Sequence, residues 1–287
     1  MSLESALSLI ESVKDERVLF VGDSIVDEYH YVVPMAKSPK QYLIPVLYQD
    51  KEEFEGGVQA AANHARAFCK TVDLKKSASP IRKVRMVEKH DLRKLFEVNY
   101  NGISPGDESF EEPYDCVVVT DFGHGWITTE MVKKLCALPY LAVCAQTNSH
   151  NMGFNLITKY PRADYVVIDE PEARLAAGDR YGGIESVMQK LSHNRFNKFI
   201  VTHGRHGAYG YQDGHFFKMR AFPGHPVDTM GAGDAFFSVT APMSKSGSIE
   251  DLMLIGNAAG SMKCQIPGQG AVTKERLIEF LKTHEPF

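Results

Sequence analysis

Apolar residues are spaced in two ways along the chain, at helical intervals and in short continuous runs, and the first change between the two comes early. Helical spacing runs from Ala6 to Lys14 and gives way to a short continuous apolar run over Arg17–Val21, which Gly22 and Asp23 stop. A continuous apolar run that ends at Gly-Asp is typical of a buried parallel strand leading into a functional loop. We therefore expect a helix followed by a core strand.

The segments that follow are rich in β-branched and aromatic residues but are interrupted by proline. Tyr29–Val33, Tyr42–Tyr48 and Ile81–Val98 have this composition, and the prolines in or beside the first two are Pro34, Pro39 and Pro45. Because proline cannot donate to a sheet ladder, it is confined to edge or exposed strands. The pattern predicts a small separate sheet, a lid, with strands at approximately 28–50 and 81–98.

From residue 115 onward the rhythm becomes strand, loop, helix. Apolar runs at Cys116–Thr120, Leu141–Ala145, Tyr165–Ile168 and Phe199–Thr202 alternate with helical patterns, and Asp213-Gly214 is typical of a tight hairpin turn. This alternation indicates βαβ units and a parallel sheet with helices on both faces. We predict a single α/β domain over residues 1–287, a three-layer α/β/α fold with a mostly parallel sheet and the small β-sheet lid.

Composition narrows the classes of partner. Of the 287 residues, 44% are hydrophobic and 24% charged, the proportions of an ordinary soluble protein. A net charge of -4 disfavours nucleic acid as a partner. The five widely spaced cysteines include no C-x-x-C pair, so neither a disulfide framework nor a zinc site is indicated. The start of the chain lacks the features of a signal peptide and no apolar stretch could span a bilayer, so we expect a cytoplasmic protein without membrane contact.

The sharpest local signal is the stretch of small residues at 228–237, where Gly231, Ala232 and Gly233 precede an apolar helical pattern. Amides at a helix N-terminus favour an anion, and glycines let a ligand approach the backbone closely. Asp234 places a carboxylate beside this anion hole. In phosphoryl transfer both parts have a role, since the migrating group is the anion and the carboxylate takes the proton from the attacking alcohol. The alternative is a plain glycine turn before a helix with an Asp in its first turn.

The sequence D-T-x-G-A-G-D at residues 228–234 resembles the signature of ribokinase-like (phosphofructokinase-B type) carbohydrate kinases. The resemblance implies the ribokinase-like form of the α/β/α fold, Asp234 as catalytic base, and ATP and Mg²⁺ as cofactors. It also allows K⁺ near the Asp228 turn. Neither the Walker pattern nor the G-x-G-x-x-G of a nicotinamide enzyme is present.

On the acceptor side, the sequence G-D-x-x-x-D at residues 22–27 resembles the heptose-phosphate kinase branch of this family. By that likeness Asp27 and Asp23 would hold substrate hydroxyls, although Asp23 could instead cap a turn. The pair Gly56-Gly57 resembles the family's glycine pair at a hinge, where substrate meets backbone. The family's Asn after this pair is absent, so Gln59 or Asn63 would have to replace it.

The resemblance extends to the nucleotide and metal side. Glu172, with Asp169 three residues before it, stands where the family has the Glu that organises Mg²⁺ and phosphate through water. The residues implied to bind the nucleotide are Thr202, Gly204, Gly207, Asn257, Asp228 and Thr229.

The chain also departs from the family pattern. Between Cys69 and Pro80 there is room only for a short connection, and Ala145–Asn148 replaces the D-P-K/N-type loop expected after a core strand. Asp121 is either a second carboxylate in the cleft or a turn-forming residue. These changes lie on the substrate side, so they bear on substrate identity more than on phosphoryl transfer.

The function predicted is ATP-dependent phosphorylation of a sugar or sugar-phosphate hydroxyl, with a heptose- or hexose-phosphate favoured. Six basic residues could contact its phosphate: Lys37, Lys40, Arg82, Lys83, Arg85 and Lys89. The alternatives are a kinase for a nucleoside or free hexose, or a sugar- or nucleotide-binding homologue without turnover. Because a small isolated sheet has little core and leaves edges unpaired, we also expect a homodimer through the lid.

Overall fold

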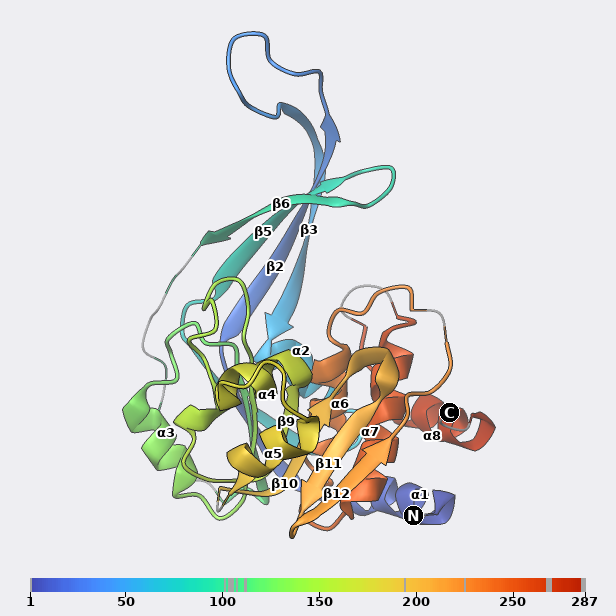
Figure 1. Cartoon of the computed structure of the whole chain (residues 1–287). Helices are drawn as coiled ribbons and strands as arrows, with labels where there is room; N and C mark the ends of the chain where they lie inside the picture. The colour runs from blue at the N-terminus through green and yellow to red at the C-terminus, as the bar shows by residue number, and fades with distance from the viewer. Residues whose placement is uncertain are drawn as a thin grey trace.

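The computed structural model describes residues 2–100, 102, 106, 108–110, 113–193, 195–224, 226–266 and 270–284. The chain forms a broad α/β body from which a second, smaller sheet projects (Figure 1). The helix at the N-terminus, α1 (Leu3–Ser12), and the last helix, α8 (Lys274–Thr283), lie on the same side of the body.

The body is built on an eight-stranded sheet with the order β12-β11-β10-β9-β8-β7-β1-β4. The strands from β10 to β4 run parallel, and β11 and β12 add an antiparallel hairpin at one edge. Their bounds are β1 (Arg17–Gly22), β4 (Thr71–Lys76), β7 (Cys116–Asp121), β8 (Leu141–Ala145), β9 (Ala163–Asp169), β10 (Phe196–Thr202), β11 (Ala208–Gln212) and β12 (His215–Met219). The predicted hairpin is present, and both Asp213 and Gly214 have the positive φ that its tight turn requires.

Helices cover both faces of this sheet. On one face α1, α2 (Val58–Ala65), α6 (Ala232–Thr240), α7 (Ile249–Lys263) and α8 pack in one hydrophobic core. On the other, α3 (Thr129–Cys136), α4 (Glu170–Ala177) and α5 (Ile184–Ser192) form a second core. Short 3-10 turns lie at Ile157–Lys159 and Gly204–His206. The predicted three-layer α/β/α fold with a mostly parallel sheet is confirmed.

The lid is a four-stranded sheet with the order β3-β2-β5-β6, which rises from the body as two long and two shorter strands (Figure 1). Its strands are β2 (Ser24–Pro34), β3 (Val46–Gly57), β5 (Ile81–Glu88) and β6 (Lys94–Tyr100). β2 pairs antiparallel with β3 and parallel with β5, and β5 pairs antiparallel with β6. The separate lid sheet predicted from the sequence is therefore present.

Two details of the N-terminal third differ from the sequence prediction. The strand expected at Tyr42–Tyr48 begins only at Val46 and continues to Gly57, because Pro45 cannot donate to the ladder and the polar residues after it pair with β2. The segment between Cys69 and Pro80, expected to be only a connection, forms the edge strand β4 beside β1.

No helix in the described ranges is both long and apolar enough to cross a membrane. All five cysteines are unbonded, and Cys69, Cys116 and Cys144 are buried in the core.

Candidate active site

The loops that follow the parallel strands meet at one edge of the main sheet, beneath the lid. Asp23 follows β1, Asp121 ends β7, Gln146 follows β8 and Asp169 ends β9. In open α/β sheets, ligands bind at the carboxyl ends of the strands. This edge is therefore the place where the chain brings its polar side chains together.

The small residues of the signature motif form the N-terminus of α6. Gly231 is the N-cap residue with a positive φ of 75°, a conformation that glycine adopts without strain. The turn before it is closed by a hydrogen bond from the Met230 amide to Asp228 Oδ1 at 3.0 Å. A Cβ at Gly233 would meet no atom within 4 Å, so the space beside this backbone is open. The helix N-terminus thus has the form of an accessible anion site.

A cavity of about 480 Å³ opens beside this helix end. A volume in this range is typical of small-molecule sites. Its walls include two of the anion-hole residues, Ala232 and Gly233, and five of the six residues implied to bind a nucleotide: Thr202, Gly204, Gly207, Thr229 and Asn257. The sixth, Asp228, does not line the cavity and closes the turn described above. The structure thus brings residues from β10 to α7 together around one cavity.

Asp234 lies in the first turn of α6, where its carboxylate Oδ1 accepts a hydrogen bond from Gln146 Nε2. Burial raises the pKa of Asp234, while the Gln146 hydrogen bond and the positive charges of Lys83 and Lys263 act to lower it. Asp234 therefore has one fixed hydrogen-bond partner and two cations within electrostatic range. This environment can hold a carboxylate that accepts a proton.

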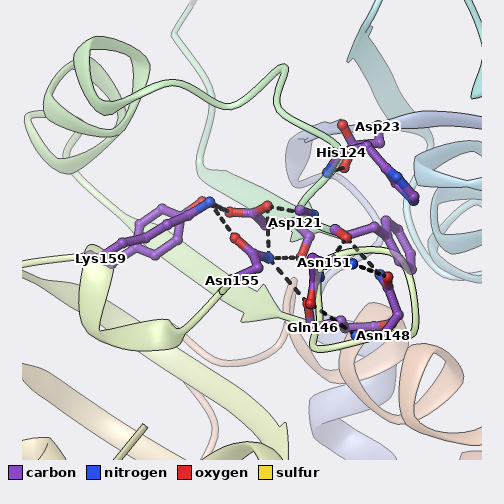
Figure 2. A network of polar contacts seen from close by, with 11 residues as sticks. Asp23, Asp121, His124, Gln146, Asn148, Asn151, Asn155 and Lys159 are labelled. Carbon is purple, nitrogen blue, oxygen red and sulfur yellow. Dashed lines mark hydrogen bonds and ion pairs between the residues drawn. The ribbon is translucent and has the colours of Figure 1, made fainter. Parts of the chain in front are cut away.

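The Gln146 backbone is fixed by a buried polar network (Figure 2). Its carbonyl accepts from Asn151 Nδ2 at 2.9 Å and from Asn155 Nδ2 at 3.2 Å, and its amide donates to the Asp121 carbonyl at 2.8 Å. Asp121, which is 1% exposed, also accepts from Tyr160 Oη at 2.6 Å. The loop that departs from the family pattern thus holds the partner of Asp234 in place.

On the lid side, Asp27 of β2 forms an ion pair with Arg85 of β5, which also pairs with Glu97 at 2.7 Å. A Cβ at Gly56 would lie 2.7 Å from Asp27 Oδ2, so glycine there leaves room for this carboxylate. The charge of Asp27 acts on Asp234 and raises its pKa. Asp27 is thus the predicted acceptor-side carboxylate that lies within electrostatic range of Asp234.

Lys83 shares this inner face of the lid, because it pairs in register with Asp27 on the neighbouring parallel strand. Burial lowers the pKa of its ammonium group, and the charges of Asp27, Glu97 and Asp23 oppose that shift. Among the described residues, Lys83 makes no hydrogen bond and no ion pair. It is a partly buried cation without a fixed partner, placed among the carboxylates of the site.

Asp23 lies deeper than Asp27 and is only 1% exposed. One oxygen accepts weakly from the His124 amide at 3.4 Å, and the other has no partner in the described structure. Burial and the charge of Asp121 raise the pKa of Asp23 to about 7. The structure thus places Asp23 against the backbone of the loop after β7.

The remaining acceptor-side candidates lie where β3 meets α2. Gly57 has a φ of 59°, and a Cβ there would approach the Asp23 carbonyl to 2.4 Å, so only glycine fits. Gln59 Nε2 donates to Asn63 Oδ1 at 3.4 Å, within α2. The two residues considered as replacements for the missing Asn are thus bonded to each other.

The two candidates on the metal side form a capping box at the start of α4. The Glu172 amide donates to Asp169 Oδ1 at 2.7 Å, and the Asp169 amide donates to Glu172 Oε2 at 2.9 Å. The other oxygen of Glu172 accepts from the Thr147 amide at 2.8 Å. Burial raises the pKa of Glu172 to about 8, with Asp169 contributing in the same direction. Asp169 also lines the cavity, whereas Glu172 is not among its lining residues.

Three residues of the site carry little or no signal in the sequence. Gln146 and Lys263 reach Asp234 from other elements, and no motif marks either of them; the replaced loop at Ala145–Asn148 is the only pointer to Gln146. Lys83 is one basic residue among six, and only its register with Asp27 sets it apart.

One protein family and several solved structures are similar to this chain. Residues 155–276 match the pfkB family carbohydrate kinases. The fold is similar to that of ribokinase from Thermotoga maritima, with 16% identity, a TM-score of 0.72, and coverage of 93% of this chain and 100% of that one. It is also similar to Arabidopsis thaliana ribokinase complexed with ribose and ATP, at 16% identity and a TM-score of 0.67, covering 93% and 99% of the two chains. Phosphofructokinase-2 from Escherichia coli in complex with potassium gives 12% identity and a TM-score of 0.69, with the same coverage of 93% and 99%. At these identities the solved structures share the fold.

Proposed function

We infer from the match of residues 155–276 that this chain is a carbohydrate kinase, a phosphotransferase, and propose that it transfers the γ-phosphoryl group of ATP to a hydroxyl of a sugar or sugar phosphate. The observation that carries the proposal is the position of Asp234. It lies in the same helical turn as Gly233, which lines the cavity, and within electrostatic range of Asp27 and Lys83 on the lid. Asp234 therefore stands between a nucleotide site and an acceptor site.

In the proposed reaction the acceptor hydroxyl oxygen attacks the γ-phosphorus of ATP. The bond from that phosphorus to the bridging oxygen breaks, ADP leaves with the electron pair, and Asp234 takes the hydroxyl proton. Amides at Gly231 to Gly233 donate to the oxygens of the migrating group, where negative charge is greatest. Gln146 holds one Asp234 oxygen, which leaves the other for the acceptor.

Mg²⁺ would neutralise charge on the nucleotide phosphates. In the described part of the chain, no three His, Cys, Asp or Glu side chains gather into a metal site. Asp169 at the cavity wall, with Glu172 in the same capping box, fits an ion that would arrive with the nucleotide and contact these carboxylates through water.

The favoured acceptor is a heptose- or hexose-phosphate, and Lys83 supports an anionic group on it. Arg85 is already paired with Asp27 and Glu97, and Arg82 pairs with Glu28 on the other face of the lid. Lys37 and Lys40 lie on the loop between β2 and β3 at the far end of the lid (Figure 1), and Lys89 lies in the turn after β5. Lys83 is the one of the six basic residues that faces the carboxylates of the site without a fixed partner in the described structure.

We also propose that two copies associate through their lids. Among the described residues, more than half of the exposed large apolar side chains belong to the lid, including Phe96, Val98 and Tyr100 on the edge strand β6. An unpaired edge with apolar side chains is a ready site for another strand. A second lid would cover it.

ADP release measured over a panel of sugars, their phosphates and nucleosides tests the proposal. We expect ADP formation that depends on an acceptor and is fastest with a sugar phosphate. Turnover of free sugars or nucleosides alone would reassign the substrate. Nucleotide binding without ADP release for any acceptor would instead support a homologue without turnover.

A further inference from the structure

The end of α7 packs directly beneath the turn that precedes α6. The amides of Val227 and Asp228 both donate to the Cys264 carbonyl, at 2.8 and 3.1 Å. Lys263, the last residue of α7, is only 3% exposed. A lysine is almost never buried to this degree unless it is paired. Its position beneath the signature motif therefore requires an explanation.

The Lys263 side chain runs from α7 toward the N-terminus of α6. A Cβ at Gly231 would lie 3.5 Å from Lys263 Cε, so the lysine stem passes under the N-cap residue of the anion hole. Its ammonium donates to the Ile266 carbonyl at 3.1 Å. This lysine is thus held by a carbonyl oxygen, which is the kind of ligand that a hard monovalent cation also prefers.

The charge of the Lys263 ammonium acts on two carboxylates, those of Asp228 and Asp234. Burial lowers the pKa of Lys263, and the charges of Asp228, Cys264 and Asp234 oppose that change. In the other direction, Lys263 acts to lower the pKa of Asp234. The ammonium therefore supplies a fixed positive charge to both ends of the motif at residues 228–234.

A K⁺ ion near the Asp228 turn, which the family resemblance allows, would have to share this space. Two positive charges close together in a poorly solvated site repel each other strongly. Lys263 already provides the charge, the carbonyl contact and the position under Gly231. The residues present therefore do not fit a bound K⁺.

We propose that the Lys263 ammonium is a built-in cation that takes the place of a bound monovalent ion beneath the anion hole, so that this kinase works without K⁺. The proposal rests on the proposed kinase activity only for its rate measurements. The charge keeps the Asp228 turn and the α6 N-terminus in the arrangement that receives the nucleotide phosphates. With this charge in place, no ion has to bind before the nucleotide does.

The first experiment compares the wild-type protein in potassium chloride and in tetramethylammonium chloride at equal ionic strength. We expect kcat and the ATP affinity measured by calorimetry to agree within about twofold between the two salts. The melting temperature should agree within about one degree, because a ligand that does not bind the native state does not stabilise it. A requirement for K⁺ in turnover, or a rise in melting temperature specific to K⁺, would overturn the proposal.

The second experiment removes the charge. Lys263→Ala should lower kcat/KM for ATP by roughly tenfold or more in tetramethylammonium, and K⁺ should restore part of it by entering the vacated space. Lys263→Arg keeps a cation and should remain indifferent to K⁺. If Lys263→Ala stays fully active without K⁺, or is impaired equally in both salts while still folded, the lysine is not an ion substitute.

Lys198→Met is the matched control. Lys198 is also partly buried and donates to two carbonyls, those of Ser244 and Gly247 at 2.6 and 2.7 Å, but it lies toward the opposite end of β10 from Thr202. Its loss should lower stability without creating a response to K⁺. Should no acceptor be turned over, the melting temperatures still decide. A K⁺-specific stabilisation confined to Lys263→Ala supports the proposal, and one in the wild type or the control contradicts it.

Discussion

The main sheet of the body and the sheet of the lid are built on opposite principles. Every residue of β7 in the body is buried, and its run of valines packs against helices on both sides. In the lid strand β3, by contrast, Gly56 is the single buried residue, and most of the others are charged or polar. The body is stabilised by burial of apolar surface, whereas the lid depends on strand pairing and charge pairs.

This difference separates two tasks of the site. The body supplies the parts that must be rigid in the proposed reaction: the helix end with Gly231, the proposed base Asp234 and the buried network around Gln146. The lid supplies Asp27, Lys83 and Arg85, charged groups on an inner face. Changes in the body should therefore impair the chemistry for every acceptor, and changes in the lid should alter which acceptor is used.

The largest effect is expected from Asp234→Asn. Removal of the base should lower kcat by at least about a hundredfold, since general-base catalysis is worth roughly a hundred- to ten-thousand-fold. ATP affinity measured by calorimetry should change little, because in the proposed reaction the nucleotide is held by the cavity rather than by this carboxylate. A bulky residue at Gly233 is the contrasting variant and should weaken both binding and turnover. An Asp234→Asn enzyme that keeps most of its activity would remove Asp234 from the base role.

The next effect comes from Gln146, which reaches Asp234 from the loop after β8. A base works in its ionised form, so kcat/KM for the acceptor rises with pH through the pKa of Asp234. Gln146→Leu removes a hydrogen bond that lowers this pKa, so the acidic limb of the profile should move to higher pH by roughly one to two units, since such a bond to a charged group is worth about 1.5–3 kcal/mol.

Gln146→Glu sharpens this test. The substitution keeps the shape of the side chain but sets two carboxylates against each other, so they share a proton and the acidic limb should move further than in the Leu variant. Thermal unfolding of both variants reports whether the fold survives. A profile that loses height without moving along the pH axis would assign Gln146 a purely structural part.

The same contrast decides what the sequence could predict. The buried strands of the body are visible as apolar runs, and the motif at residues 228–234 points directly to the proposed anion hole and to Asp234. The part of β3 after residue 50 is not visible as a strand, because Glu52, Glu53 and Glu55 have no apolar alternation and owe their conformation to pairing with β2. Gln146 and Lys263 could not be predicted, since only the tertiary fold brings the Gln146 amide group to Asp234 and the Lys263 charge within electrostatic range of it.

A smaller effect, confined to specificity, is expected at Lys83. Lys83→Met should lower kcat/KM for a phosphorylated acceptor by about tenfold relative to its unphosphorylated counterpart, the loss expected for one hydrogen bond to a charged group. Arg82→Met is the neighbouring control. Arg82 lies on the same strand as Lys83 but on its outer face, where it pairs with Glu28 of β2. Equal losses for both acceptors in Lys83→Met would mean that the lysine only balances the carboxylates around it.

A substitution on the edge strand β6 of the lid should change the turnover rate least, but it should clearly change the molecular mass of the protein in solution. Val98 pairs in register with Val84 and Phe96 with Met86, so β5 and β6 share an apolar stripe on the face opposite Lys83. A charge there would have to be buried in a dimer at a cost, whereas it is harmless in a monomer. Val98→Glu should therefore convert a dimer to a monomer in light scattering.

Phe154→Glu is the control, because Phe154 is 92% exposed but belongs to the loop after β8. A wild-type protein that is monomeric at micromolar concentration would show that the lid is stable as a sheet without a partner.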